Sequence, residues 1–214
     1  MSARVELDDT TRLHIEKAVD SLVDEFGEVQ SRETIQRVME DSLRQLVGDA
    51  QVDDFVPTLA HRFARERLKA LGRALGPEAD LPDVVFVGLG DTGRGQMAAA
   101  LLTLRSEGAI VAHSAGSAVE GAIDPAVVEV MAELGVDLSE AYAKPVSREV
   151  LEAADLVVTM GRSVGAIQLP AETRHIDWRV GDPSGAPVDE VRRVRDDIDR
   201  RVTALIAELA GDRA

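Results

Sequence analysis

Residues 84–97 read VVFVGLGDTGRGQM and decide the fold. A short β-branched run leads into a turn with four glycines, and the turn leads into a segment that continues as a helix. Glycines let the backbone point successive N–H groups inward, and a helix N-terminus adds positive potential. The stretch therefore predicts a strand, an anion-binding loop and a helix, with Arg94 placed to add a bidentate clamp on a phosphate.

Strands and helices alternate on the C-terminal side of this loop. Strands are expected over 83–87, 110–114, 156–160 and 174–177. Helices are expected over about 96–107, from Pro125 through Leu134, from a Ser147 cap to near Ala154, and over 191–209. This alternation favours an α/β fold with a doubly wound, four-stranded parallel sheet that is covered on both faces. The charge run over 192–201 is expected to be the solvated face of the last helix.

Residues 1–75 carry helical patterns only. Apolar residues recur at spacings of three and four in three stripes: Ile15, Val19, Leu22, Val23 and Phe26; Ile35, Val38, Met39, Leu43, Leu46 and Val47; and Phe55, Leu59, Phe63, Leu68, Leu71 and Leu75. Such spacing is typical of amphipathic helices. We expect the third helix to begin near Asp53 or Asp54. The domain boundaries expected are therefore a three-helix bundle over 1–76, a linker over 76–82 and an α/β domain over 83–214.

Composition limits the function classes. The net charge is −15 and both halves are acidic, so nucleic acid and anionic membranes are not expected partners. No apolar run approaches the roughly 20 residues of a membrane helix, and the polar, acidic N-terminus is unlike a signal peptide, so a cytoplasmic location is expected. The four histidines show no metal-ligand spacing. We expect neither a metal nor a cofactor.

The glycines also satisfy a second pattern. Gly88, Gly90 and Gly93 match G-x-G-x-x-G, which dinucleotide-binding folds use for the same purpose. That fold also needs an acidic residue at the end of the next strand, about 20 positions on. The strand here ends in HSAG at 113–116. Dinucleotide binding is therefore an alternative, and the weaker one.

The loop and several later motifs resemble the low-molecular-weight tyrosine phosphatases and arsenate reductases. In that family a Cys, five other residues and an Arg precede a Ser. The linked motifs here are QMAAALL at 96–102, HSAG at 113–116, LGVDLS at 134–139, KP at 144–145, ADLVVTMG at 154–161, DW at 177–178 and DP at 182–183. They follow the family's order over roughly residues 83–210. The helical N-terminus resembles the bundle of some actinobacterial arsenate-reductase-like proteins, where it is associated with dimerisation.

The resemblance assigns roles to residues of this chain. Arg94 takes the position of the family's clamp and Asp182 that of its general acid. The oxyanion-binding loop it implies consists of Leu89, Gly90, Asp91, Thr92, Gly93, Arg94 and Gly95. Gly88 stands at the position of the nucleophilic Cys, and Gly95 at that of the supporting Ser. The sequence contains no cysteine at all, so no thiolate can attack phosphorus or reduce arsenate.

These observations lead to one main expectation and one rival. The main one is a non-catalytic relative that acts as a homodimeric module for binding phosphate, arsenate or sulfate, or for regulation. The rival is a weak phosphatase in which water or Asp91 replaces the thiolate. For Asp91 we favour a structural role, in which its carboxylate caps loop amides or pairs with Arg94 and closes the site.

Overall fold

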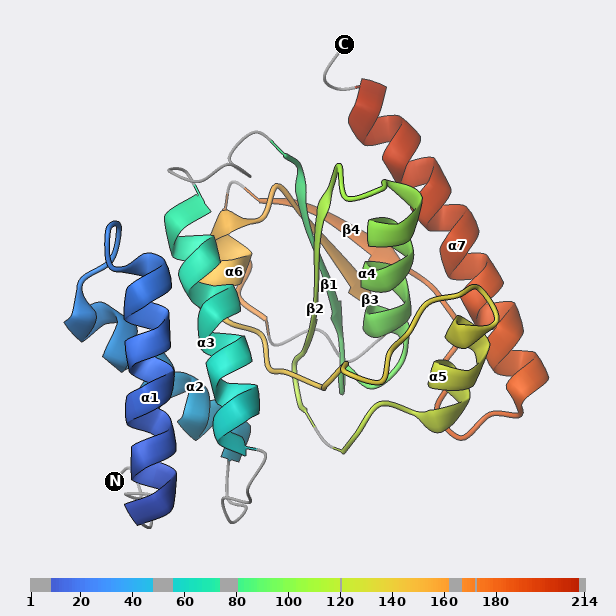
Figure 1. The fold of residues 1–214 in the computed structure, drawn as a ribbon. Coiled ribbons are helices and arrows are strands. Elements are labelled where there is room, and N and C mark those ends of the chain that lie inside the picture. The colour runs from blue at the N-terminus through green and yellow to red at the C-terminus, as the bar shows by residue number, and fades with distance from the viewer. Residues whose placement is uncertain are drawn as a thin grey trace. The chain divides into compact units, whose positions relative to one another are not determined.

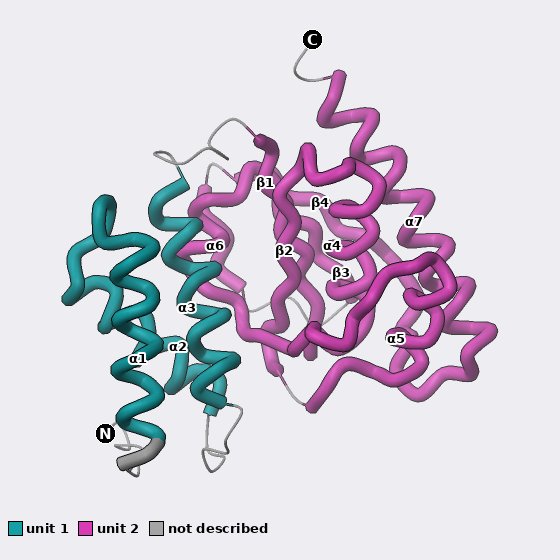
Figure 2. The backbone as a smooth tube through the Cα atoms, viewed as in Figure 1, with its two compact units in different colours: residues 1–79 teal, residues 80–214 magenta. Residues whose placement is uncertain are grey.

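The computed structural model describes residues 9–47, 56–73, 81–119, 121–161, 167–171 and 173–211 (Figure 1). The chain divides into two compact units, residues 1–79 and 80–214 (Figure 2). Most of the expected linker, Asp53, Asp54, Phe55 and Leu75 lie outside the described residues. Among the described helices, none is both long and apolar enough to cross a membrane.

The N-terminal unit consists of α1 (Asp9–Phe26), α2 (Arg32–Val47) and α3 (Val56–Gly72). The first two expected stripes lie in its core, with Leu22 and Ile35 fully buried. From the third stripe Leu68 joins this core, together with Ala60 and Ala64, whereas Leu59 is only half-buried. The Ser31 hydroxyl accepts the Thr34 N–H and caps the start of α2. Leu71 departs from the expected stripe because it lies in the last turn of α3, where its side chain is exposed.

The C-terminal unit is built on a parallel sheet with the strand order β2-β1-β3-β4. The strands are β1 (Asp83–Gly88), β2 (Val111–Gly116), β3 (Leu156–Met160) and β4 (Arg174–Trp178). In the register of β1 and β2, Gly88 lies opposite Gly116, so both strands end at the same level. All residues of β1 and β3 are buried, which is typical of central strands in a parallel sheet.

Helices lie on both sides of this sheet, which confirms the predicted fold class (Figure 1). One face carries α4 (Arg94–Arg105), α5 (Pro125–Ala132) and α7 (Val188–Gly211), and the other carries α6 (Arg148–Ala153). The larger core lies between strands β1 and β3 and helices α4, α5 and α7, and includes Phe86, Leu101 and Ile198. The Phe86 and Trp178 rings lie 5.6 Å apart within it.

Helix starts follow the capping rules, with one difference that matters for the site. Ser147 caps α6 by accepting the Val150 N–H, as predicted. Asp124 caps α5 by accepting the Ala126 N–H, with Pro125 in the first turn. Helix α4 begins at Arg94, two residues before the predicted start, because Gly95 does not interrupt its first turn, and Gly93 is its N-cap. Arg94 is therefore held by a helix and not by a free loop.

The charge run on α7 is not entirely a solvated face. Arg195 is buried, and its Nη1 donates to the Val130 carbonyl at 2.7 Å and to Glu133 Oε2 at 2.6 Å. Arg192 donates to the same carboxylate, with Nη2 2.5 Å from Oε1. Sequence periodicity could not reveal this because the acceptors belong to α5 and the residue after it. These bonds tie the end of α5 to the first turns of α7.

This cluster predicts a loss of stability in acid. Hydrogen bonds from Arg192, and then from Arg195, lower the pKa of Glu133 from 4.5 to about 2. A group with a depressed folded-state pKa stabilises the fold above its unfolded pKa, and that contribution is lost as the pH falls from about 4.5 to about 2. Urea unfolding should show wild type more stable than Glu133→Gln at pH 7, with the gap closing over that window. An unchanged gap at pH 2 would contradict this.

Candidate oxyanion-binding site

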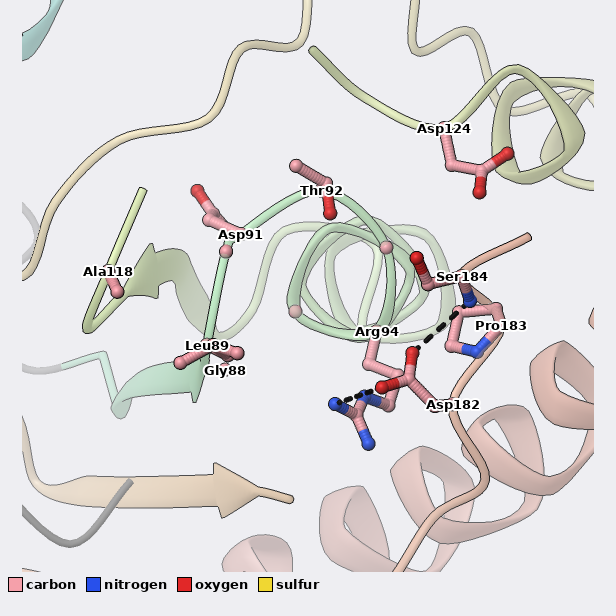
Figure 3. Close-up of a pocket in the computed structure, with 13 residues that line it drawn as sticks. Gly88, Leu89, Asp91, Thr92, Arg94, Ala118, Asp124, Asp182, Pro183 and Ser184 are labelled. Atoms are coloured by element: carbon pink, nitrogen blue, oxygen red, sulfur yellow. Dashed lines mark hydrogen bonds and ion pairs between the residues drawn. The ribbon is translucent and has the colours of Figure 1, made fainter. Parts of the chain in front are cut away.

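The expected loop residues line a pocket of about 250 Å³ at the carboxyl ends of the strands (Figure 3). Strand order reverses between β1 and β3, since β2 lies on one side of β1 and β3 on the other. Open α/β sheets place their ligands at such a switch point. The pocket is lined by Gly88, Leu89, Gly90, Asp91, Thr92, Gly93, Arg94, Gly95, Ala118, Asp124, Asp182, Pro183 and Ser184.

The backbone of the loop is arranged to receive an anion. The carbonyls of Gly88, Leu89 and Thr92 accept hydrogen bonds from Ser117, Ala118 and Asp124, in segments outside the loop. Within the described parts of the chain, no acceptor is hydrogen-bonded to the N–H groups of Leu89, Gly90, Thr92, Gly93, Arg94 and Gly95. The loop carbonyls are thus hydrogen-bonded to residues outside the loop, while these loop N–H groups remain available beside the start of α4. Such a set of donors is an anion-binding cradle.

Gly116 is the residue that allows this loop to pack. A Cβ built on Gly116 would lie 2.9 Å from Gly90 C and Leu89 O and 3.0 Å from Asp91 N. All three neighbours are backbone atoms, so none can rotate away. The glycine in the HSAG motif therefore serves close approach of β2 to the loop.

Arg94 points toward the segment that follows β4. Its Nη1 donates to the Val180 carbonyl at 3.3 Å, and its Nη2 lies 3.4 Å from Asp182 Oδ2 (Figure 3). The guanidinium lies against Gly161, where a Cβ would be 3.0 Å from Nη2. Gly161 also has φ +100°, a backbone conformation that favours glycine. The end of β3 thus leaves room for this arginine.

Gly88 leaves an open space at the base of the pocket. A Cβ built there meets no atom within 4 Å. A Cβ at this position would therefore have room among the described residues. The resemblance to the family's loop places the nucleophilic Cys at this position.

The Asp91 carboxylate takes neither of the two expected directions. It does not pair with Arg94 or cap the loop amides. Its Oδ2 instead accepts from Gln96 Nε2 at 2.9 Å, from the Lys144 N–H at 3.1 Å and from Ser114 Oγ at 3.3 Å. The expectation of a site closed by this carboxylate is therefore wrong, because three donors outside the loop draw it away from Arg94.

Asp91 therefore anchors the loop to its surroundings. Its φ of 56° lies in the left-handed region, which aspartate adopts more readily than most residues. Gln96 extends the anchor, since its Nε2 also donates to the Tyr142 carbonyl at 3.1 Å. A buried carboxylate engaged by three donors is poorly placed to attack a ligand. This geometry gives no support to Asp91 as a nucleophile.

Gly95 lies beside this anchor. A Cβ there would be 3.2 Å from Asp91 Oδ1, which is a tight contact. Glycine leaves this space to the carboxylate. The position expected to carry a supporting hydroxyl thus adjoins the Asp91 network in this chain.

Several pocket residues were not anticipated from sequence. Asp124, Ala118 and Ser184 line the pocket, and only the Asp-Pro capping signal at 124–125 could have pointed to one of them. Trp178, which belongs to the DW motif, is buried against Phe86 and is not among the described residues that line this pocket. No group of three or more potential metal ligands occurs among the described residues.

Comparison with known families agrees with this geometry. Residues 83–214 match the family described as low molecular weight phosphotyrosine protein phosphatase. Residues 15–72 match a protein-tyrosine-phosphatase-like N-terminal domain. The chain belongs to the low molecular weight phosphotyrosine protein phosphatase family.

Individual relatives extend the comparison. A putative arsenate reductase of Halobacterium salinarum is 40% identical over an alignment of 134 residues that covers 59% of this chain and 92% of the relative. The thioredoxin-dependent arsenate reductase Cg_ArsC1' of Corynebacterium glutamicum superposes with a TM-score of 0.81 at 31% identity, covering 92% of this chain and 97% of that one. A low molecular weight protein tyrosine phosphatase from T. tengcongensis gives a TM-score of 0.53 at 26% identity, covering 59% and 99%.

Proposed function

We propose that this chain is a non-catalytic member of its family that binds a tetrahedral oxyanion and acts as a homodimeric binding or regulatory module. Phosphate, arsenate and sulfate are the candidate ions, since each offers several oxygens to a cradle of N–H groups and a guanidinium. Similarity to arsenate reductases is the reason to include arsenate.

One observation carries the proposal: the anion cradle is intact around an empty nucleophile position. Gly88 has no side chain, and the sequence offers no cysteine to replace it. The cradle N–H groups and Arg94 still line the pocket. Binding depends on these donors, whereas covalent catalysis depends on a nucleophile within reach of phosphorus. The site therefore keeps the groups for the first task and lacks the group for the second.

Calorimetry with phosphate, arsenate and sulfate tests the binding half of the proposal. At least one of these ions should bind with one-to-one stoichiometry per chain. Absence of binding by all three ions at millimolar concentration would remove the basis for an oxyanion-binding function.

The proposal that the chain forms a homodimer is based on the N-terminal unit. A three-helix unit of this size buries a small core, so association would add to its stability. Leu13 on α1 is half exposed, and Val29 and Leu71 are also large exposed apolar residues of this unit. These side chains are available for contact with a second copy.

Sedimentation velocity tests this association. We expect a dimer at micromolar concentration, and Leu13→Glu should shift it toward the monomer because a charge would be buried in the contact. Leu104→Glu, the same change at an exposed leucine of the C-terminal unit, is the control. A wild-type protein that sediments as a monomer at all concentrations would contradict the dimer.

A further inference from the structure

We infer that Asp182 is a specificity-determining residue that makes the pocket discriminate between oxyanions by their charge. The inference rests on the proposed oxyanion binding and concerns the same pocket. Asp182 stands at the family's general-acid position, but with no nucleophile present it has no leaving group to protonate. Its carboxylate is instead a negative charge on the edge of an anion site.

The contacts place this carboxylate in direct competition with a ligand. Asp182 Oδ2 lies 3.4 Å from Arg94 Nη2, so it occupies the guanidinium that would receive an oxyanion. Arg94 is largely buried, with 12% of its side chain exposed, whereas 65% of the Asp182 side chain is exposed. The arginine is therefore fixed, and the aspartate is the partner that an incoming anion displaces.

The segment that carries Asp182 is positioned over the loop. Pro183 packs on Gly93, where a Cβ would lie 3.0 Å from the proline Cγ. Asp182 Oδ1 also accepts the Ser184 N–H at 3.2 Å, which fixes a local turn. Asp182 therefore stays near the pocket even when its bond to Arg94 is broken.

Two consequences follow for binding. An anion must first release Arg94 from an exposed ion pair, a small cost that is the same for every anion. Once the anion is bound, the Asp182 carboxylate repels it in proportion to the charge of the anion. At about 4 Å in water this repulsion corresponds to about fivefold in affinity per unit of ligand charge. Monoanions are therefore favoured over dianions of the same shape.

Sulfate and perchlorate are suitable probes because both are tetrahedral, and they carry two charges and one charge near neutral pH. Binding can be followed through the amide signals of Gly90, Gly93 and Gly95 in NMR titrations at fixed ionic strength. Asp182→Asn should tighten sulfate about fivefold more than it tightens perchlorate. Asp137→Asn is the matched control, since Asp137 is exposed and accepts the Ser139 N–H in the same kind of turn, and it does not line the pocket.

The outcomes separate this inference from the function on which it rests. Equal affinities of wild type and Asp182→Asn, or an equal gain for both anions, would overturn charge discrimination while leaving oxyanion binding intact. The same would follow if Asp137→Asn produced the effect. If neither anion shifts the loop signals of wild type or Asp182→Asn, oxyanion binding itself is refuted. Dispersed spectra of all variants establish that each is folded.

Discussion

Replacing Arg94 with alanine should weaken sulfate and phosphate binding by about tenfold to hundredfold. Among the described residues that line the pocket, Arg94 supplies the one cationic side chain. A hydrogen bond to a charged group contributes about 1.5–3 kcal/mol, and a bidentate clamp makes two. Release of Asp182 and the Val180 carbonyl offsets only part of that gain, because those contacts are long, at 3.4 and 3.3 Å. A net gain equal to that of one charged hydrogen bond corresponds to the stated loss of affinity.

Calorimetry on the wild type, Arg94→Ala and Arg105→Ala measures the contribution of Arg94 to anion binding. Arg105→Ala is the matched control, because Arg105 ends the same helix and pairs with Asp199 outside the pocket. That variant should bind both anions as the wild type does. If Arg94→Ala keeps the wild-type affinity, the guanidinium is not part of the site and the pocket must be reassigned.

Gly116→Ala should lower the free energy of unfolding by about 1–2 kcal/mol and weaken anion binding. The new Cβ would lie 2.9 Å from two backbone atoms of the loop, which cannot rotate away, so the cost falls in the upper part of the range of about 1–3 kcal/mol for overpacking. Reduced freedom of the unfolded chain returns about 0.4–1 kcal/mol of that cost. Displacement of residues 89–91 also moves cradle N–H groups away from the anion.

Gly88→Ala is the control, since Gly88 is the register partner of Gly116 and its Cβ meets nothing within 4 Å. We expect this variant to be as stable as wild type or more stable by up to about 1 kcal/mol, because the unfolded chain loses freedom and no clash opposes the gain. Urea unfolding can be followed through Trp178, the chain's one tryptophan, which packs against Phe86 in the same sheet. Identical unfolding midpoints for the two variants would show that the close approach at Gly116 is not limiting.

Local sequence signals predicted most of the fold. Strand β3 has the predicted bounds, 156–160, because a buried parallel strand reads as an uninterrupted β-branched run. Ser147 begins α6 as its capping chemistry requires. The loop over 88–95 could be recognised because glycines, a preceding strand and a following helix occur together in one short stretch.

The contacts that complete the site could not be predicted in the same way. The three donors to Asp91 come from β2, α4 and the segment at 144, and their meeting depends on strand order and register. Arg195 shows the same limit, because helical periodicity assigns a face but not the carbonyl that a long side chain reaches. The absence of a cysteine nucleophile, in contrast, could be predicted from the sequence alone, because it depends only on which residue types are present.

The most direct test of the non-catalytic role is an activity assay on the purified and unmodified chain. Turnover is measured with an aryl phosphate, and with arsenate in the presence of a thioredoxin system. We predict rates no higher than those of the Arg94→Ala variant prepared in the same way. Turnover well above that level, abolished by Asp182→Ala, would contradict a non-catalytic role and show that another group performs the attack.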